Sequence, residues 1–148
     1  MLHPSFYKTM INYLLQLGSL LDPPFEGNPD YIDYWALFTA NPSLDSFATV
    51  EATYGGYARQ HYARTPTIWQ LLDGPPAYAS NRQQITFPPA TSGAGQVLTH
   101  WGWLYPDIGS GGASYGLVVS GALEIPVTVA LGQSLIYPAN AFRVQSPF

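Results

Sequence analysis

The sequence predicts a mainly β domain: a jelly-roll-like antiparallel β-sandwich of about eight strands, preceded by an N-terminal α-helix or arm. Two observations lead to this expectation. From residue 54 onward, short runs rich in Val, Ile, Thr, Tyr and Trp alternate with Gly and Pro clusters, as in antiparallel strands joined by turns. The chain has 148 residues, which is long enough for one such domain with its own core.

The first 30 residues are expected to form an arm, separate from a sandwich that spans residues 31–148. Apolar residues recur here at spacings of three and four, which predicts a helix from about Ser5 to Leu21. Asp22-Pro23-Pro24 ends it, because proline cannot continue the hydrogen-bond ladder. The helix either packs on its own domain or reaches a neighbouring subunit, and the candidate contact residues are Phe6, Tyr7, Met10, Leu14, Leu17 and Phe25.

The second segment is expected to contain the strands. The first begins near Tyr31 and ends at an Asn41-Pro42 turn, and residues 43–53 follow as a surface loop. Residues 66–80 are expected to form a long exposed loop. The other expected strands are Gly56–Ala63, Gln84–Phe87, Gln96–Tyr105, Tyr115–Leu123, Val127–Ala130, Ser134–Tyr137 and Phe142–Gln145.

The chain is poor in charge and rich in aromatic residues. Charged residues make up 9%, well under the roughly 25% of an average soluble domain, and aromatic residues make up 15%. Because interface cores are depleted in charge and enriched in Tyr and Trp, this composition suggests burial against other chains. The alternative is an aromatic-rich β-domain that is merely low in charge. A net charge of −4 with a single lysine argues against nucleic acid as a partner, and no apolar run approaches the length of a membrane span.

No pattern of catalytic or metal-binding residues is evident. The three histidines, His3, His61 and His100, are scattered, and most acidic residues stand beside turn formers, where they usually bond the local backbone. The sequence contains no cysteine, no GxSxG motif, no P-loop and no dinucleotide-binding glycine spacing. We therefore expect a protein that is not an enzyme and that uses neither a cofactor nor a metal.

The stretch EATYGGYARQHYART, which begins at Glu51, concentrates glycine, tyrosine and arginine. The Gly55-Gly56 pair is expected to form a turn or bulge that enters a strand on which Tyr57, Arg59 and His61 face one way. Arginine stacks on aromatic rings and binds carboxylates with a fixed fork of donors, so Glu51 is its candidate partner. Glu51, Tyr57 and Arg59 are thus interpreted as framework residues, with a contact to another subunit as the alternative.

The stretch HWGWLY forms an aromatic patch. Trp101, Trp103 and Tyr105 alternate along an expected strand, so they share one face. Such a row stacks sugars in carbohydrate-binding modules, and it equally fills cores or subunit interfaces. The core or interface interpretation is favoured.

Several short motifs follow one another in a fixed order between about Leu20 and Val144. They are ALFTANPS at Ala36, the acidic residue Glu51, GGYARQ at Gly55, ITFPPATSG at Ile85, VLTHWGW at Val97, GSGGASYG at Gly109 and IPVTVALGQSLIYPANAFRV at Ile125. Their order and spacing resemble a family of small tailed-bacteriophage virion structural proteins. The chain departs from that pattern in the loop TIWQLLDGPPAYAS, which is long and apolar, and in ANAF, where a glycine is common before the last strand.

The resemblance implies a β-sandwich protein of the virion, made in the host bacterial cytoplasm. Proteins of this kind are capsid decoration (cement) proteins or minor tail and fibre components. The first expectation is a cement protein on the outer capsid surface, which binds the major capsid protein and itself, with a trimer favoured over a dimer. A tail or fibre component is the second expectation, and a carbohydrate-binding module that uses Trp101 and Trp103 is the third.

Overall fold

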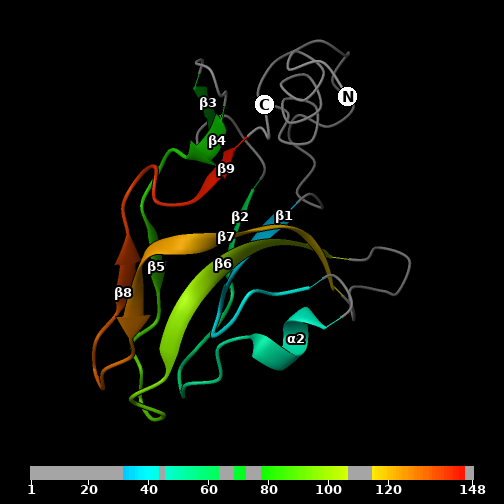
Figure 1. Ribbon diagram of the computed structural model, residues 1–148. Coiled ribbons are helices and arrows are strands. Elements are labelled where there is room, and N and C mark those ends of the chain that lie inside the picture. Colours follow the sequence, from blue (N-terminus) through cyan, green and yellow to red (C-terminus); the bar gives the residue numbers. More distant parts are fainter. Residues whose placement is uncertain (1–31, 44–45, 64–68, 73–77, 107–114, 146–148) are drawn as a thin grey trace.

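The computed structural model describes residues 32–43, 46–63, 69–72, 78–106 and 115–145 (Figure 1). The expected N-terminal helix and its candidate contact residues lie outside these ranges, as does the boundary between the arm and the sandwich. The described elements are β1 (Ile32–Phe38), α2 (Phe47–Val50), β2 (Gln60–Ala63), β3 (Trp69–Leu72), β4 (Tyr78–Asn81), β5 (Ile85–Phe87), β6 (Val97–Pro106), β7 (Tyr115–Thr128), β8 (Leu135–Tyr137) and β9 (Arg143–Gln145).

The strands form three antiparallel sheets, which confirms the predicted mainly β, antiparallel fold. The largest sheet has the order β2-β1-β6-β7, and the long, curved β6–β7 pair dominates it (Figure 1). The second sheet has the order β3-β4-β9, and the third is the pair β5-β8. Each sheet joins strands that lie far apart in the sequence, so the topology depends on long-range pairing.

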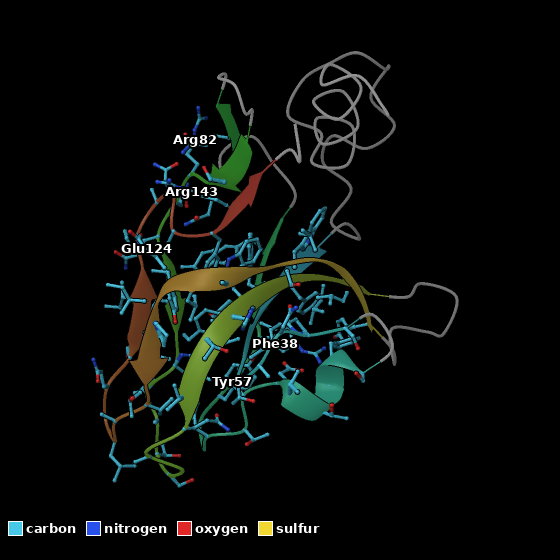
Figure 2. All side chains as sticks on the ribbon, in the orientation of Figure 1. Phe38, Tyr57, Arg82, Glu124 and Arg143 are labelled. Carbon is cyan, nitrogen blue, oxygen red and sulfur yellow. The ribbon has the colours of Figure 1, made fainter. Side chains whose placement is uncertain are left out.

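The four-stranded sheet is covered on both faces. On the face that we call the inner face, Trp35 pairs with Trp103 and Leu37 pairs with Trp101. These side chains pack with residues of the β5–β8 pair in one buried cluster, which forms the core between the two sheets. The opposite, outer face carries a smaller buried cluster of Ala36, Phe38, Leu104 and Leu117. Phe47 and Val50 of α2 pack against this cluster, and Figure 2 shows Phe38 on the side of the sheet where α2 lies.

A register shift in the β6–β7 ladder decides which side chains of β7 reach each face. Trp103 pairs with Val119, but the next residue of β6, Leu104, pairs with Leu117, so Val118 is an extra residue in β7. A regular strand would send Leu117 and Val119 to the same face. Because of the shift, Val119 packs against the inner cluster and Leu117 belongs to the outer one.

Aromatic rings fill the middle of the inner cluster. The Phe142 ring lies 5.1 Å from the ring centroids of both Trp35 and Trp101, with interplanar angles of 28° and 21°. Phe142 comes from the turn before β9, so the C-terminal part of the chain completes the core. Offset ring contacts of this kind add to the free energy gained by burying large aromatic side chains.

The predicted break at Glu124-Ile125-Pro126 is wrong, because β7 continues through it from Tyr115 to Thr128 and includes the strand expected at Val127–Ala130. Proline removes a ladder donor and is tolerated in strands mainly at sheet edges. In the order of the sheet β7 is an edge strand, and residues 123–126 have no partner in β6 at the register shift between Leu98 and His100, so Pro126 removes no ladder bond.

Three further expectations from the sequence are corrected. The region 66–80, expected to be a loop, contains β3 and part of β4, which pair with each other and with β9. The expected loop at 43–53 contains the short helix α2. The strand expected from Gly56 begins only at Gln60, because the chain first completes a turn at Gly56, where φ is 86°.

Candidate functional site

Glu51 is fixed on the outer side of the sheet by its own backbone. It follows α2 directly and forms an isolated antiparallel bridge with Phe38, the last residue of β1. The amide of Thr39 donates to the carbonyl of Val50 at 2.8 Å, and the amide of Ala52 donates to the carbonyl of Leu37 at 2.8 Å. These bonds extend the β1 ladder where β2 no longer reaches, so the Glu51 carboxylate is held beside the sheet.

Arg59 binds this carboxylate with two parallel hydrogen bonds. Its Nε donates to Glu51 Oε1 at 2.7 Å and its second terminal nitrogen donates to Oε2 at 2.6 Å. The side chains are only 23% and 11% exposed, respectively. The bidentate geometry matches the planar fork of arginine to the two oxygens, which strengthens the pair and fixes its orientation. Hydrogen bonding to Glu51 raises the pKa of the Arg59 guanidinium above its ordinary value.

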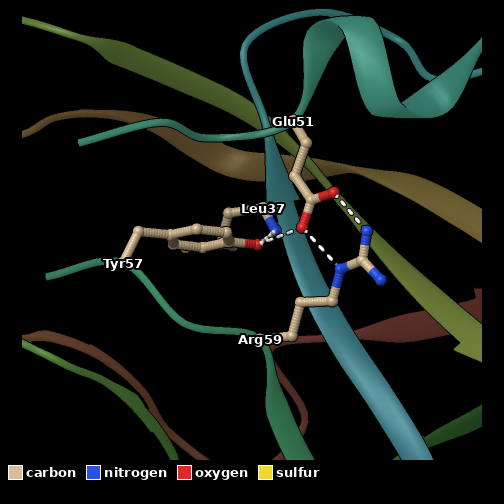
Figure 3. A network of polar contacts seen from close by, with 4 residues as sticks. All are labelled: Leu37, Glu51, Tyr57 and Arg59. Atoms are coloured by element: carbon tan, nitrogen blue, oxygen red, sulfur yellow. Dashed lines mark hydrogen bonds and ion pairs between the residues drawn. The ribbon is translucent and has the colours of Figure 1, made fainter. Parts of the chain in front are cut away.

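Tyr57 joins this ion pair to the sheet (Figure 3). Its hydroxyl donates to Glu51 Oε1 at 3.0 Å and accepts from the amide of Leu37 at 3.1 Å. Burial, followed by the charge of Glu51, raises the pKa of the Tyr57 phenol far above its ordinary value. The hydroxyl therefore stays protonated and serves as donor and acceptor at once. We call Glu51, Tyr57, Arg59 and the Leu37 amide the Glu51 clasp.

The clasp confirms one prediction and corrects another. The expected pairing of Glu51 with Arg59 is present. Tyr57 does not share a face with Arg59: its ring stacks on Phe87 in the inner cluster, 6.2 Å between centroids. The reason is that Tyr57 stands in the turn that ends before β2, where the alternation of a strand does not apply; its amide donates to the carbonyl of Tyr54 at 3.0 Å.

Arg59 also covers an aromatic ring on the outer face. Its guanidinium carbon lies 4.5 Å from the centroid of Tyr115, a cation–π distance. Tyr115 meets Tyr34 edge-on at 5.0 Å, and Tyr34 lies 5.7 Å from the ring of the exposed His61. Burial, with a hydrogen bond to Tyr115, raises the pKa of the Tyr34 phenol. The rings and the guanidinium thus contact one another, as expected of a framework.

Trp101 and Trp103 belong to the core, being 1% and 3% exposed. Sugar stacking on these two rings is therefore excluded. The backbone of Tyr105 lies in β6, and its side chain is outside the described part of the structure. The Trp101 indole lies against Gly121 of β7, where an added Cβ would come within 2.9 Å of the indole nitrogen.

Sequence reasoning missed a buried amide centred on Asn81. Its side chain donates to the carbonyls of Gln83 and Pro138 at 2.8 and 2.9 Å, and its oxygen accepts from the amide of Phe142 at 2.9 Å. Asn81 is fully buried. These bonds hold the turn that delivers Phe142 to the core, and they satisfy backbone groups that the turn would leave unpaired.

The same turn contains Asn140, whose φ is 68°. This left-handed conformation favours glycine, and asparagine is among the few other residues that adopt it readily. Its side-chain oxygen accepts from the hydroxyl of the buried Ser80 at 2.7 Å. The ANAF motif was the available signal, because it departs from a pattern in which a glycine is common before the last strand.

The described residues give no support for a metal or a membrane span. Within them, no three or more His, Cys, Asp or Glu side chains group as ligands for a metal ion. His61 and His100 lie on different strands, and His100 Nδ1 is 2.8 Å from Thr99 Oγ1. Among the described residues, no helix is long and apolar enough to cross a bilayer.

Comparison with known proteins identifies the family. No curated protein sequence matches the chain. The family model described as podophage GP4 fiber I protein gp80 matches residues 29–145, which include every described strand and the Glu51 clasp. The resemblance to bacteriophage virion structural proteins is thereby confirmed at the level of the family, while the match does not distinguish a capsid decoration protein from a fibre. The chain belongs to the family of the podophage GP4 fiber I protein gp80.

Proposed function

We propose that the chain is a structural, non-catalytic component of a bacteriophage fibre. The observation that carries this proposal is the match over residues 29–145 to a family that is named after a fibre protein. The match favours a fibre protein over a cement protein. A cement protein that binds the major capsid protein on the outer capsid surface stays the alternative.

The internal chemistry of the described residues supports a mechanical role. The carboxylate of Glu51 receives donors from Arg59 and Tyr57, and the amide of Asn81 bonds three backbone groups. Polar groups committed in this way stabilise the fold, whereas a catalytic group needs to face a bound substrate. The pattern fits a rigid module that transmits load through its β-framework.

Association with other chains is part of the proposal. Only 9% of the chain's residues are charged, and a low content of charge is typical of proteins whose surface is partly covered in an assembly. The first segment offers the apolar contact residues Phe6, Tyr7, Met10, Leu14, Leu17 and Phe25. Removal of residues 1–22 is expected to leave the β-domain folded and to prevent incorporation into particles. Unchanged incorporation of the truncated chain would refute the role of this segment.

Copy number in purified particles tests the fibre proposal. Quantitative mass spectrometry would count this chain against the major capsid protein. A few copies per particle, released together with the other fibre proteins, are the expected result. A copy number comparable to that of the major capsid protein would overturn the fibre role in favour of a cement protein. Absence from particles would overturn both.

A further inference from the structure

We propose that residues 115–121, at the free edge of β7, pair antiparallel with the same residues of a second copy of the chain. Among the described residues, β7 has a strand partner on one side only, namely β6. It is also the longest described strand, from Tyr115 to Thr128. An edge of this length presents a row of backbone donors and acceptors that another strand can bind.

The backbone of Leu37 shows toward which neighbouring strand the amide and carbonyl groups of each residue in the four-stranded sheet point. Its amide donates to Tyr57 Oη and its carbonyl accepts from Ala52, so both groups point away from β6. In an antiparallel sheet, successive residues direct these groups alternately to one neighbour and to the other. The adjacent residue Ala36 therefore directs its amide and carbonyl toward β6.

This alternation places Ser120 at the open edge. Ala36 stands opposite Gly102 of β6, and Gly102 stands opposite Ser120 of β7. Since Gly102 bonds Ala36, it has no backbone group left for β7. Ser120 consequently directs its amide and carbonyl outward, where no described strand meets them.

The first half of this edge has no protection by charge or proline. Residues 115–121 read YGLVVSG, with no charge and no proline. Natural sheet edges are usually protected by charged side chains, proline, very short strands or β-bulges, and of these devices residues 115–121 carry only the extra residue at Val118. The second half of β7 has such protection, because it carries the exposed Glu124 and Pro126; Figure 2 shows Glu124 on the part of β7 that turns toward β8. The opposite edge of the sheet, β2, is short: Gln60–Ala63.

A second copy of the same segment fits this edge better than an unrelated strand. The segment is uncharged, so two copies do not repel each other, and it has no charge that would select a charged partner. Its β-branched and aromatic residues favour extended structure. Glu124 and Pro126 protect the rest of the strand, so the pairing is limited to residues 115–121. A second copy of residues 115–121 has the length that this contact needs. The resulting contact is isologous and two-fold, so the proposed unit of assembly is a dimer, whereas the sequence favoured a trimer.

The test measures the mass of the protein in solution as a function of its concentration, by light scattering coupled to size exclusion. The full chain is compared with two lysine variants. Ser120→Lys adds a charge at the proposed contact. His61→Lys makes the same change at the exposed position of β2, on the opposite edge of the sheet, and is the matched control. We expect a dimer for the full chain and for His61→Lys, with the dissociation constant of Ser120→Lys raised at least about tenfold.

A second measurement on the unaltered chain covers the case in which Ser120→Lys fails to fold. Amide hydrogen exchange in residues 115–121 should slow as the concentration passes the dimer dissociation constant, and exchange in β2 should not change. A monomer at all concentrations, a trimer, or a dimer in which residues 115–121 exchange unaltered would each overturn the proposal. The fibre role is tested separately by copy number in particles, so the two proposals can fail independently.

Discussion

Replacing Tyr57 with phenylalanine removes one hydroxyl from the Glu51 clasp and leaves the ring in place. The ring keeps its stacking on Phe87, so little apolar contact is lost. The substitution removes the acceptor for the Leu37 amide and the donor to Glu51. Leu37 is fully buried, so water cannot readily replace the missing acceptor.

The two lost bonds set the expected magnitude. A buried donor left unsatisfied costs about 1–3 kcal/mol, and the hydrogen bond to a carboxylate is itself worth about 1.5–3 kcal/mol. Glu51 keeps both hydrogen bonds from Arg59, and its side chain is 11% exposed. These bonds and this exposure partly compensate the loss of the bond from Tyr57. We expect Tyr57→Phe to lower the free energy of unfolding by about 2–3 kcal/mol.

Denaturant unfolding followed by circular dichroism measures this change, with an unaltered m-value as the sign that only stability has changed. Tyr54→Phe is the matched control, because the Tyr54 hydroxyl makes one neutral bond, to the carbonyl of Pro88 at 3.3 Å. That control should cost about 1 kcal/mol or less. If Tyr57→Phe costs no more than Tyr54→Phe, the clasp does not tie the ion pair to the sheet.

A double-mutant cycle locates the coupling. Glu51→Gln removes the charge that Tyr57 and Arg59 share and keeps the shape of the side chain. If the three side chains act as a unit, the costs of Tyr57→Phe and Glu51→Gln should differ from additivity by about 0.5–3 kcal/mol. Strict additivity would show that the tyrosine stabilises the Leu37 amide alone.

Three further predictions concern buried groups. Asn81→Ala removes the three hydrogen bonds of a fully buried side chain and should cost about 3–4 kcal/mol in denaturant unfolding; a loss below about 1 kcal/mol would show that the amide is not structural. Gly121→Ala places a Cβ within 2.9 Å of the Trp101 indole, so it should cost about 1–3 kcal/mol of stability and change the tryptophan fluorescence. In the control Gly116→Ala the added Cβ meets no atom within 4 Å, so stability and fluorescence should stay unchanged. Burial raises the pKa of Tyr137 to about 12, so as the pH rises the unfolded chain loses this proton before the folded chain does. The free energy of unfolding should therefore keep its full value below about pH 10 and fall between about pH 10 and 12. Because the Tyr137 hydroxyl has no hydrogen-bond partner among the described residues, Tyr137→Phe should be neutral or stabilising at pH 7 and should flatten the alkaline decline; an unchanged alkaline slope would contradict this.

Local chemistry made several features readable in advance. Period-two runs bounded by Gly and Pro predicted most strands of the described region, since alternation reflects one strand and its two faces. The Glu51–Arg59 pair was also predictable, because the two residues are close in sequence and arginine has a specific geometric preference for a carboxylate. The low charge predicted association in general terms, but it named neither a partner nor a surface.

Other features depend on contacts between distant parts of the chain. The segments β3 and β4 are too short to be predicted from their own residues, and they are stabilised by pairing with each other and, through β4, with β9 near residue 145. Asn81 lacked a local signal because its partners Pro138 and Phe142 lie far along the sequence. The extra residue at Val118, which sends Leu117 and Val119 to opposite faces, is a property of the β6–β7 register. A sequence pattern reports what one segment prefers, whereas register, bulges and the direction of Tyr57 are fixed only when packed neighbours compete for the same space and the same hydrogen bonds.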